Sequence, residues 1–278
     1  MDLTEYGTGA QLYFDDRSRN YGIAEVIPDR FGIVHTTKVW DVPDKDVPLN
    51  QGREGACSGF SLSTELAASP VNVDVSNASA LELYQAARRI DAAAGRHWES
   101  GASILAGALA LKNDYKLITE FRWAFGIEQV IDAIIAKGPV VLGLNWYYDM
   151  YRPNAENVIE VSGELKGRHA ITAIGYLHED GGYLALMNTW GPGYGAKGIG
   201  YLKVADATRL LAEDGEACII TDLATTAKLP RVIASESGKT FHKPDAHKWA
   251  SWLSTPRTFG NRDEAIAAGL RPCWMCKP

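Results

Sequence analysis

The chain has 278 residues, of which 46% are hydrophobic and 22% are charged, and its formal net charge is −6. This composition is typical of a globular protein large enough for one main domain and a smaller one, and it excludes a disordered or fibrous chain. The longest apolar stretches are too short to cross a bilayer and the N-terminus is polar, so we expect no signal peptide and no membrane span. Four irregularly spaced cysteines do not form a disulfide framework, which favours a reducing compartment.

Charge is distributed unevenly along the chain. Residues 227–278 contain nine Lys/Arg and four Asp/Glu, a net charge of +5, which leaves −11 for residues 1–226. Apolar periodicity lapses between 224 and 238, where Pro, Ser and Thr accumulate. We therefore predict two domains, 1–226 and 227–278.

The first domain has helical patterns first and strand patterns later. Apolar residues spaced for one buried face predict a helix that begins at Cys57 and ends before Ser69-Pro70, and further helices over 80–94, 103–112 and 127–137. Later runs rich in apolar, β-branched and aromatic residues predict strands over 139–146, 168–177, 183–190 and 198–204. A helix-rich half followed by a strand-rich half indicates an α+β protein with a cleft where the halves meet.

The segment QGREGACSGF (51–60) places a lone cysteine, Cys57, at the start of the first of these helices. The positive end of the helix dipole favours thiolate over thiol, and the flanking glycines allow close approach of a substrate. Taken alone, such a cysteine is more often a small core residue. A nucleophile here also needs a base, a group that orients the base and donors for an oxyanion.

Candidates for these three roles lie elsewhere in the chain. His169 lies in a predicted strand, Asn188 lies at the end of the next one, and Gln51 precedes the cysteine by six residues. Each also has an ordinary structural interpretation, since a strand histidine is often structural and an Asn before a glycine-rich loop can be a turn residue. His97, His178 and Cys218 are interpreted as packing or surface residues.

Three segments carry these candidates in the order Gln, Cys, His, Asn: QGREGACSGFS, GRHAITAIGY and NTWGPGYGAKGIGYLKV. They resemble the glutamine-cysteine, histidine and asparagine-tryptophan boxes of papain-like cysteine peptidases, and the similarity extends from about residue 35 to about residue 222. The resemblance implies a two-lobed fold, with a helical lobe and an antiparallel β-barrel-like lobe, that hydrolyses peptide or protein substrates without a catalytic cofactor.

The resemblance also implies roles for individual residues. Cys57 would be the nucleophile, His169 the general acid and base, and Asn188 the group that orients the imidazole. The side-chain amide of Gln51 and the backbone N–H of Cys57 would receive the oxyanion. Three further residues are expected to support the site or line the substrate cleft: Trp190, Gly101 and Ser58.

The chain departs from the family pattern in several places. Ser58 follows the nucleophile where the family often has Trp or Tyr, and Glu54 stands where a disulfide cysteine is usual. Only 50 residues precede Gln51, too few for the long inhibitory prosegment of secreted members. We therefore expect a compact prokaryotic or viral type of enzyme, cytoplasmic or virion-associated, that is active without zymogen cleavage.

Two alternatives to hydrolysis remain open at the level of sequence. The same thioester intermediate could pass its acyl group to an amine, which would make the enzyme an acyl transferase. The papain-like scaffold could also be a non-catalytic binding or structural component.

The C-terminal domain ends in a short predicted helix (DEAIAAG) and a Cys-x-x-Cys turn formed by Cys273 and Cys276. Two thiolates at this spacing bind one tetrahedral zinc ion readily, with His242 and His247 as the remaining ligands. Zinc would stabilise a segment of about 50 residues that buries little core. A thiol pair without a metal and a redox pair are the alternatives.

Residues 259–278 also resemble the small zinc-binding domain of the Ada-type methyl-accepting DNA-repair regulator. The resemblance degrades at the first ligand pair, where His242 and Ala246 stand in place of two cysteines and His247 follows. The net charge of +5 and the aromatic residues would suit an anionic partner such as nucleic acid. A solvated basic face over a small aromatic core is the simpler interpretation.

Overall fold

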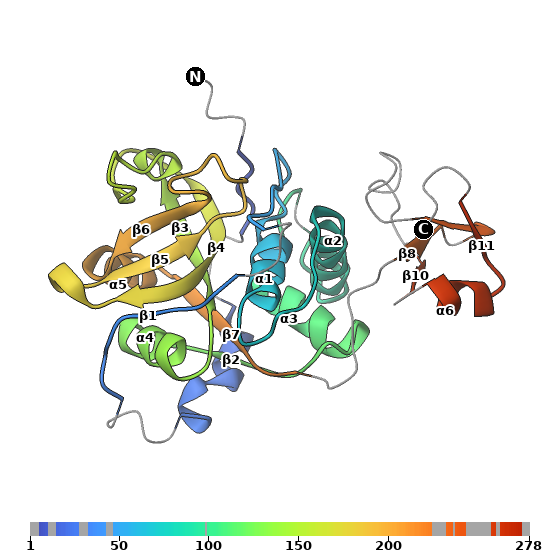
Figure 1. The fold of residues 1–278 in the computed structure, drawn as a ribbon, viewed down its shortest axis with the longest axis horizontal. Coiled ribbons are helices and arrows are strands. Elements are labelled where there is room, and N and C mark those ends of the chain that lie inside the picture. The colour runs from blue at the N-terminus through green and yellow to red at the C-terminus, as the bar shows by residue number, and fades with distance from the viewer. Residues whose placement is uncertain are drawn as a thin grey trace.

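The structure is a computed structural model and describes residues 6–10, 15–27, 33–42, 47–97, 99–223, 232–235, 237–242, 257–259 and 262–273. Figure 1 shows a large body made of helices on one side and a sheet on the other, with a small C-terminal sheet beside it. The predicted α+β class is confirmed. The predicted domain boundary at 226/227 lies outside the described residues.

Five α-helices belong to the large body: α1 (Cys57–Ala67), α2 (Asn77–Ala93), α3 (Ile104–Leu109), α4 (Ile127–Ala136) and α5 (Val204–Ala212). Ser76 caps α2 in a reciprocal capping box with Ser79, and Ser103 caps α3, so two of the N-termini have their free N–H groups satisfied by side chains. Short helical turns complete this set: η2 (Asp16–Tyr21), η3 (Ile23–Glu25), η5 (Ala110–Asp114), η6 (Tyr148–Tyr151) and η7 (Glu179–Gly181).

The large sheet has seven strands: β1 (Lys38–Val39), β2 (Ile118–Trp123), β3 (Val140–Tyr147), β4 (Leu165–Leu177), β5 (Tyr183–Met187), β6 (Ile199–Lys203) and β7 (Glu216–Leu223). Their order is β2-β7-β3-β4-β5-β6, with β1 added to β4, and every pairing is antiparallel. In the pairing of β3 with β4, Leu144 lies opposite His169.

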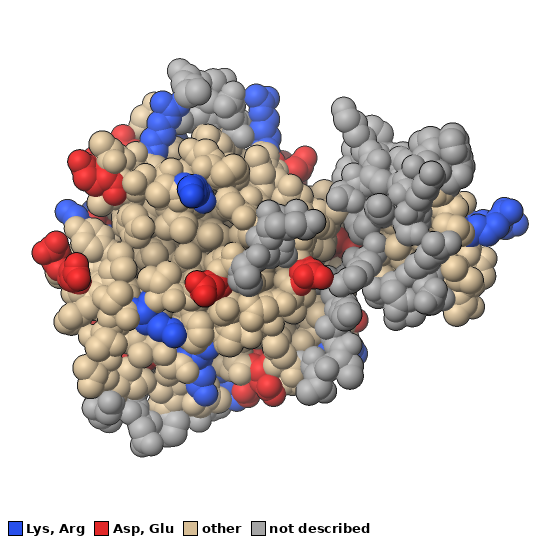
Figure 2. All heavy atoms as spheres, viewed as in Figure 1, with Lys and Arg blue, Asp and Glu red and all other residues tan. Residues whose placement is uncertain are grey.

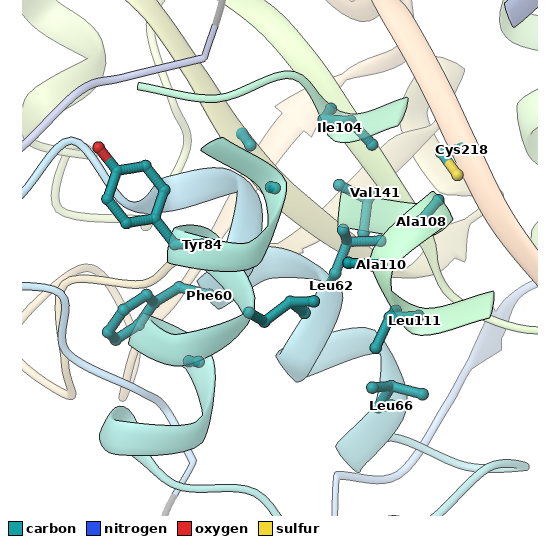
Figure 3. Packing of buried hydrophobic residues seen from close by; sticks show 14 of the residues in the cluster. Phe60, Leu62, Leu66, Tyr84, Ile104, Ala108, Ala110, Leu111, Val141 and Cys218 are labelled. Atoms are coloured by element: carbon teal, nitrogen blue, oxygen red, sulfur yellow. The ribbon is translucent and has the colours of Figure 1, made fainter. Parts of the chain in front are cut away.

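Two large hydrophobic clusters lie in the large body, beside a small one that includes Ile174, Ala185 and Met187. One lies among α1, α2 and α3 and the sheet face that they cover; Figure 3 shows Leu62 and Leu66 of α1 in this cluster, with Ile104 of α3 and Val141 of β3. The other lies inside the curved sheet and beneath α4 and α5, and it includes Trp146 and Trp190. The chain therefore forms two lobes that share the strands at the centre of the sheet.

Helix α1 lies at the junction of the two lobes, and all of its residues are buried. The hydroxyl of Thr172 on β4 donates to the carbonyl of Ser61, and the N–H of Ile220 on β7 donates to the carboxyl of Glu65 at 2.6 Å. These bonds fix the start of α1, and with it Cys57, against β4.

The small C-terminal sheet contains β8 (Val232–Ala234), β9 (Thr240–His242), β10 (Arg257–Phe259) and β11 (Arg271–Pro272), in the order β10-β8-β9-β11, beside helix α6 (Arg262–Ala267). It has a hydrophobic cluster of its own that includes Phe241, Ala265 and Leu270. The predicted short helix is thus confirmed, and the described part of this segment packs around a separate core.

Charged side chains of both signs are interspersed over the face of the large body seen in Figure 2. Among the described helices, none has the length and apolar composition needed to cross a lipid bilayer.

Candidate active site

Cys57 is the first residue of α1 and is fully buried. Backbone N–H groups of four residues lie within hydrogen-bonding reach of its sulfur: Ala170, Gly9, Ala10 and Ser58. Ala170 directly follows His169 on β4, so the thiol and the predicted base come from adjacent positions of two packed elements. Burial raises the pKa of the Cys57 thiol to about 11, and the backbone hydrogen bonds counteract this effect only in part.

His169 is also fully buried, and its Nε2 lies 2.8 Å from Oδ1 of Asn188. The same Oδ1 accepts the N–H of Thr189 at 2.8 Å. Because an amide oxygen can only accept, Nε2 of His169 carries the hydrogen of the shared bond, and Nδ1 is the free acceptor of the neutral ring. Nδ1 has no hydrogen-bond partner among the described residues. Asn188 therefore selects the tautomer that a proton-accepting imidazole needs.

Aromatic rings enclose the imidazole. The ring of Trp190 lies 4.6 Å from the ring of His169, and the ring of Trp146 lies 4.8 Å from it in an edge-on arrangement. Burial lowers the pKa of His169 to about 4, although its bond to Asn188 acts in the opposite direction. The predicted position of Trp190 beside the His169–Asn188 pair agrees with this arrangement.

Gln51 lies in the loop before α1 and is held by the segment that follows Asn188. Its N–H donates to the carbonyl of Thr189 at 2.9 Å, and its side-chain oxygen accepts a short hydrogen bond from the hydroxyl of Thr189. The side-chain nitrogen is consequently turned toward the site, where it donates to the carbonyl of Gly7 at 3.1 Å and to that of Glu54 at 2.6 Å. Thr189 is a residue that the sequence analysis did not single out.

The remaining two support candidates have different surroundings. Gly101 has a φ of +90°, which suits glycine, and its N–H donates to the hydroxyl of Tyr84 at 3.1 Å. The next residue, Ala102, forms a parallel β-bridge with Ala10. Ser58 is fully buried within α1, and its hydroxyl has no hydrogen-bond partner among the described residues.

An N-terminal segment, residues 6–10, lies across this site, and we call it the N-terminal strap. The N–H groups of Gly9 and Ala10 both donate to the carbonyl of Arg168, at 3.1 and 3.2 Å, and the N–H of Ala102 donates to the carbonyl of Gly9 at 3.2 Å. The carbonyl of Gly7 accepts from Gln51 and from the indole N–H of Trp190, the latter at 3.1 Å. The backbone of residues 6–10 therefore lies beside Cys57, where the sequence analysis predicted a cleft between the two halves.

The predicted zinc ligands are only partly described. His242 ends β9 and Cys273 follows β11; these strands pair in parallel, and the N–H of Cys273 donates to the carbonyl of Phe241 at 2.9 Å. The two candidates therefore lie next to each other across the small sheet. His247 and Cys276 lie outside the described residues. Within the described part of the chain, no three of His, Cys, Asp and Glu form a group that could hold a metal ion.

Comparisons with known proteins bear on the family and the fold. Residues 109–227, which contain His169 and Asn188, match the family model of the papain family cysteine proteases. The fold is similar to that of xylellain, a cysteine protease from Xylella fastidiosa, with a TM-score of 0.58 and 19% identity over 79% of this chain and 98% of that one. The match of residues 109–227 thus points to the papain family, and the fold over most of the chain is papain-like.

A second solved structure supports the same papain-family fold. Digestive procathepsin L 3 of Tenebrio molitor larval midgut aligns with a TM-score of 0.51 and 14% identity, over 79% of this chain and 77% of that one. No curated protein sequence matches the chain. The family match and the α+β fold of helices and an antiparallel sheet together support a papain-like cysteine peptidase.

Proposed function

We propose that this peptidase hydrolyses peptide bonds through the thiolate of Cys57, with His169 as general base and acid, Asn188 as the orienting residue and Gln51 as an oxyanion donor. The observation that supports this most directly is the His169–Asn188 bond of 2.8 Å, which leaves Nδ1 of the neutral ring as an acceptor without a hydrogen-bond partner among the described residues. The thiol's contact with the N–H of Ala170 brings the sulfur to the same point of β4.

The first half of the reaction follows from these groups. Nδ1 of His169 takes the thiol proton, and the sulfur attacks the substrate carbonyl carbon, so that a C–S bond forms and the carbonyl electron pair moves to oxygen. The amide of Gln51 and the backbone N–H of Cys57 stabilise that oxygen; one such donor is worth about 3 kcal/mol in enzymes of this type. The C–N bond then breaks, and the imidazolium gives its proton to the leaving amine.

The second half returns the enzyme to its starting state. His169 takes a proton from water, the hydroxide attacks the thioester carbon, and the C–S bond breaks to release the carboxylic acid product. The sulfur recovers the proton from the imidazolium. An amine in place of water would give acyl transfer from the same intermediate.

Cleavage profiling tests the proposal. A library of protein-derived peptides is incubated with the wild-type chain and with four variants: Cys57→Ala, His169→Ala, Asn188→Ala and Cys218→Ala. Cys218 is a buried cysteine outside the site, and its variant is the control. We expect cleavage by the wild type and the control, none by Cys57→Ala, and at least about a 10³-fold loss for His169→Ala. Cleavage that persists in Cys57→Ala would contradict the proposal, and ligated products would assign acyl transfer.

We also propose that the C-terminal segment binds one structural zinc ion through Cys273, Cys276, His242 and His247. Two soft thiolates and two imidazoles are a suitable donor set for tetrahedral zinc, and the pairing of β9 with β11 supports the proposal because it brings His242 beside Cys273. Metal analysis of the purified chain should find about one zinc per chain, lost in the variant with both cysteines replaced by Ser. A zinc content that the two replacements leave unchanged would reject the site.

A further inference from the structure

A cavity of about 250 Å³ lies beside the C-terminal half of α1, the helix that carries Cys57 at its other end. Three elements labelled in Figure 1 border it: α1 with the turn that follows it, the end of α4 and the end of β7. Helices of both lobes therefore meet β7 at this point. No residue of the candidate active site lines the cavity, so it is a separate feature of the molecule.

The cavity exists because β7 runs past the start of β3. Strand β3 begins at Val140, and its pairing with β7 ends where Val141 lies opposite Cys218. The residue before β3 is Pro139, which has no N–H with which to extend the ladder. The end of β7, residues 220–223, consequently borders the cavity on this side.

The carboxyl group of Glu65 lies at the inner end of the cavity. Glu65 is 1% exposed, and its Oε1 accepts the N–H of Ile220 at 2.6 Å. Its Oε2 has no hydrogen-bond partner among the described residues. Burial raises the pKa of Glu65 well above its ordinary range, and the bond from Ile220 counteracts this effect only in part. A buried carboxyl oxygen without a partner is costly, and a cationic group beside it would offset that cost.

A second charged group, the ammonium group of Lys137, belongs to the lining at the end of α4. Lys137 is exposed, and its ammonium group has no partner among the described residues. The carboxylate of Asp222 also belongs to the lining, but it already accepts from the hydroxyl of Thr119 at 2.7 Å and from the N–H of Leu223 at 3.0 Å. The unsatisfied groups are therefore one buried carboxyl group and one exposed ammonium group.

The remaining side chains of the lining are mostly apolar and include Pro70, Val71 and Pro139. Pockets for drug-sized ligands measure about 300–1,000 Å³, so a cavity of about 250 Å³ suits a smaller molecule. A simple amine would satisfy only Glu65, and a simple carboxylic acid would satisfy only Lys137. A small zwitterion with an apolar body complements both groups and the apolar wall.

From these observations we infer that the cavity beside the C-terminal half of α1 binds a free α-amino acid with an apolar side chain. The ammonium group of the ligand contacts Oε2 of Glu65, its carboxylate contacts Nζ of Lys137, and its side chain packs against Pro70 and Pro139. This site goes beyond the proposed peptidase reaction and does not depend on it.

Calorimetric titration with L-leucine tests the inference. The wild-type chain is compared with Glu65→Gln, which keeps the acceptor for Ile220 but cannot carry a charge, and with Lys137→Met. Lys203→Met, at an exposed position on β6, is the control. We expect each of the first two changes to lower the affinity for leucine by at least about tenfold, and the control to bind as the wild type does.

Two analogues of leucine separate the two contacts. Isoamylamine lacks the carboxylate, so its binding should weaken in Glu65→Gln and not in Lys137→Met, whereas isocaproate lacks the ammonium group and should show the opposite pattern. Protection of the buried Cys218 from alkylation shows that each variant is folded. Leucine affinity that both changes leave unaltered would overturn the inference, as would the absence of binding to the wild type up to about 10 mM leucine. Equal affinities for isoamylamine and leucine would reject the amino-acid assignment.

Discussion

Thr189 positions the side chain of Gln51, the proposed oxyanion donor, through a single hydroxyl group. Its Oγ1 donates to Oε1 of Gln51, and its N–H donates to Oδ1 of Asn188. Thr189 therefore contacts two of the proposed catalytic residues. The hydroxyl determines which end of the Gln51 amide faces the substrate, since without this donor the oxygen and nitrogen could exchange places.

We therefore predict that Thr189→Val lowers kcat by roughly tenfold, which corresponds to about 1.4 kcal/mol, and changes KM little. The shape of the side chain is retained while its donor is lost. Steady-state kinetics of the wild type and of Thr189→Val provide the measurement. A loss confined to KM would show that Thr189 does not act through the oxyanion donor.

Glu82 of α2 is a buried carboxyl group outside the site. Neither of its oxygens has a hydrogen-bond partner among the described residues, and burial raises its pKa to about 8, against the opposing effect of Arg89. The folded chain thus keeps a proton that the unfolded chain releases near pH 4.5. The contribution of this group to stability is fully present below about pH 4.5 and is lost as the pH rises toward 8.

Glu82→Gln removes this dependence because the amide is neutral at every pH. Relative to the wild type, we expect the variant to gain on the order of 1–3 kcal/mol in free energy of unfolding between pH 5 and pH 8. Urea unfolding at the two pH values measures the gain, and Glu156→Gln at an exposed position is the control. If the free energies of unfolding of the variant and the wild type differ by the same amount at pH 5 and at pH 8, Glu82 is already ionised in the folded chain.

At the level of elements, α1 and α2 approach closely at Gly59. A Cβ at this position would lie 2.5 Å from the backbone nitrogen of Tyr84 and 2.6 Å from the carbonyl oxygen of Ala80. Gly59 also lies two residues after Cys57, so this contact fixes the first turn of the helix that carries the thiol.

Gly59→Ala should consequently destabilise the fold by about 1–3 kcal/mol, the usual cost of overpacking. Gly193→Ala is the matched control, because a Cβ there meets nothing within 4 Å and should change stability by less than about 0.5 kcal/mol. Thermal unfolding of the two variants gives the comparison. Equal stability of Gly59→Ala and the wild type would refute the close packing of α1 on α2.

Long periodic elements of the fold were predictable from the sequence. The predicted helices at Cys57 and over 127–137 agree with α1 and α4, and the predicted helix over 80–94 starts three residues late. The third predicted helix, 103–112, is interrupted, because α3 ends at Leu109 and continues as a π-turn. Hydrophobic spacing indicates a buried helical face but does not distinguish an α-helix from a π-turn.

Among the α-helices and strands of six residues or more, three were missed: β2, α5 and β7. Each is an apolar run of six to nine residues, a length at which strand and helix patterns are difficult to distinguish. The predicted strand over 198–204 ran one residue into α5, because Val204 is β-branched and the helix has no side-chain cap to mark its start.

At the level of the whole molecule, the order of the three sequence motifs indicated which residues form the candidate site. It gave no indication that residues 6–10 lie over that site. His169 and Asn188 are brought together by the pairing of β4 with β5, which the sequence predicted as neighbouring strands. The strap depends on contacts between residues 6–10 and four distant segments, for which local patterns provide no signal. The alternating glycines of YGTGA were the one visible sign, and they are equally typical of a loop.

The strap has a consequence for the pH dependence of the thiol. While it is in place, burial holds the pKa of Cys57 at about 11 and that of His169 at about 4, so both groups are neutral around pH 7. The thiol therefore reacts through a thiolate fraction that rises with pH.

The rate of Cys57 alkylation in the wild type should accordingly rise about tenfold per pH unit from pH 7 to pH 10, in proportion to the thiolate fraction. Alkylation rates over this range, mapped to Cys57 by mass spectrometry, provide the test. A rate that is already level near neutral pH would show that burial does not keep the thiol neutral.

The central claim is that Cys57 carries the acyl group during turnover. A peptidyl ester is mixed with the wild-type chain, the reaction is quenched in acid within its first turnover, and the digested chain is examined by mass spectrometry. The account predicts the mass of the acyl group on the peptide that contains Cys57, and its absence in Cys57→Ala. An acyl group found on another residue, or turnover of the ester without any acyl adduct on Cys57, would contradict it.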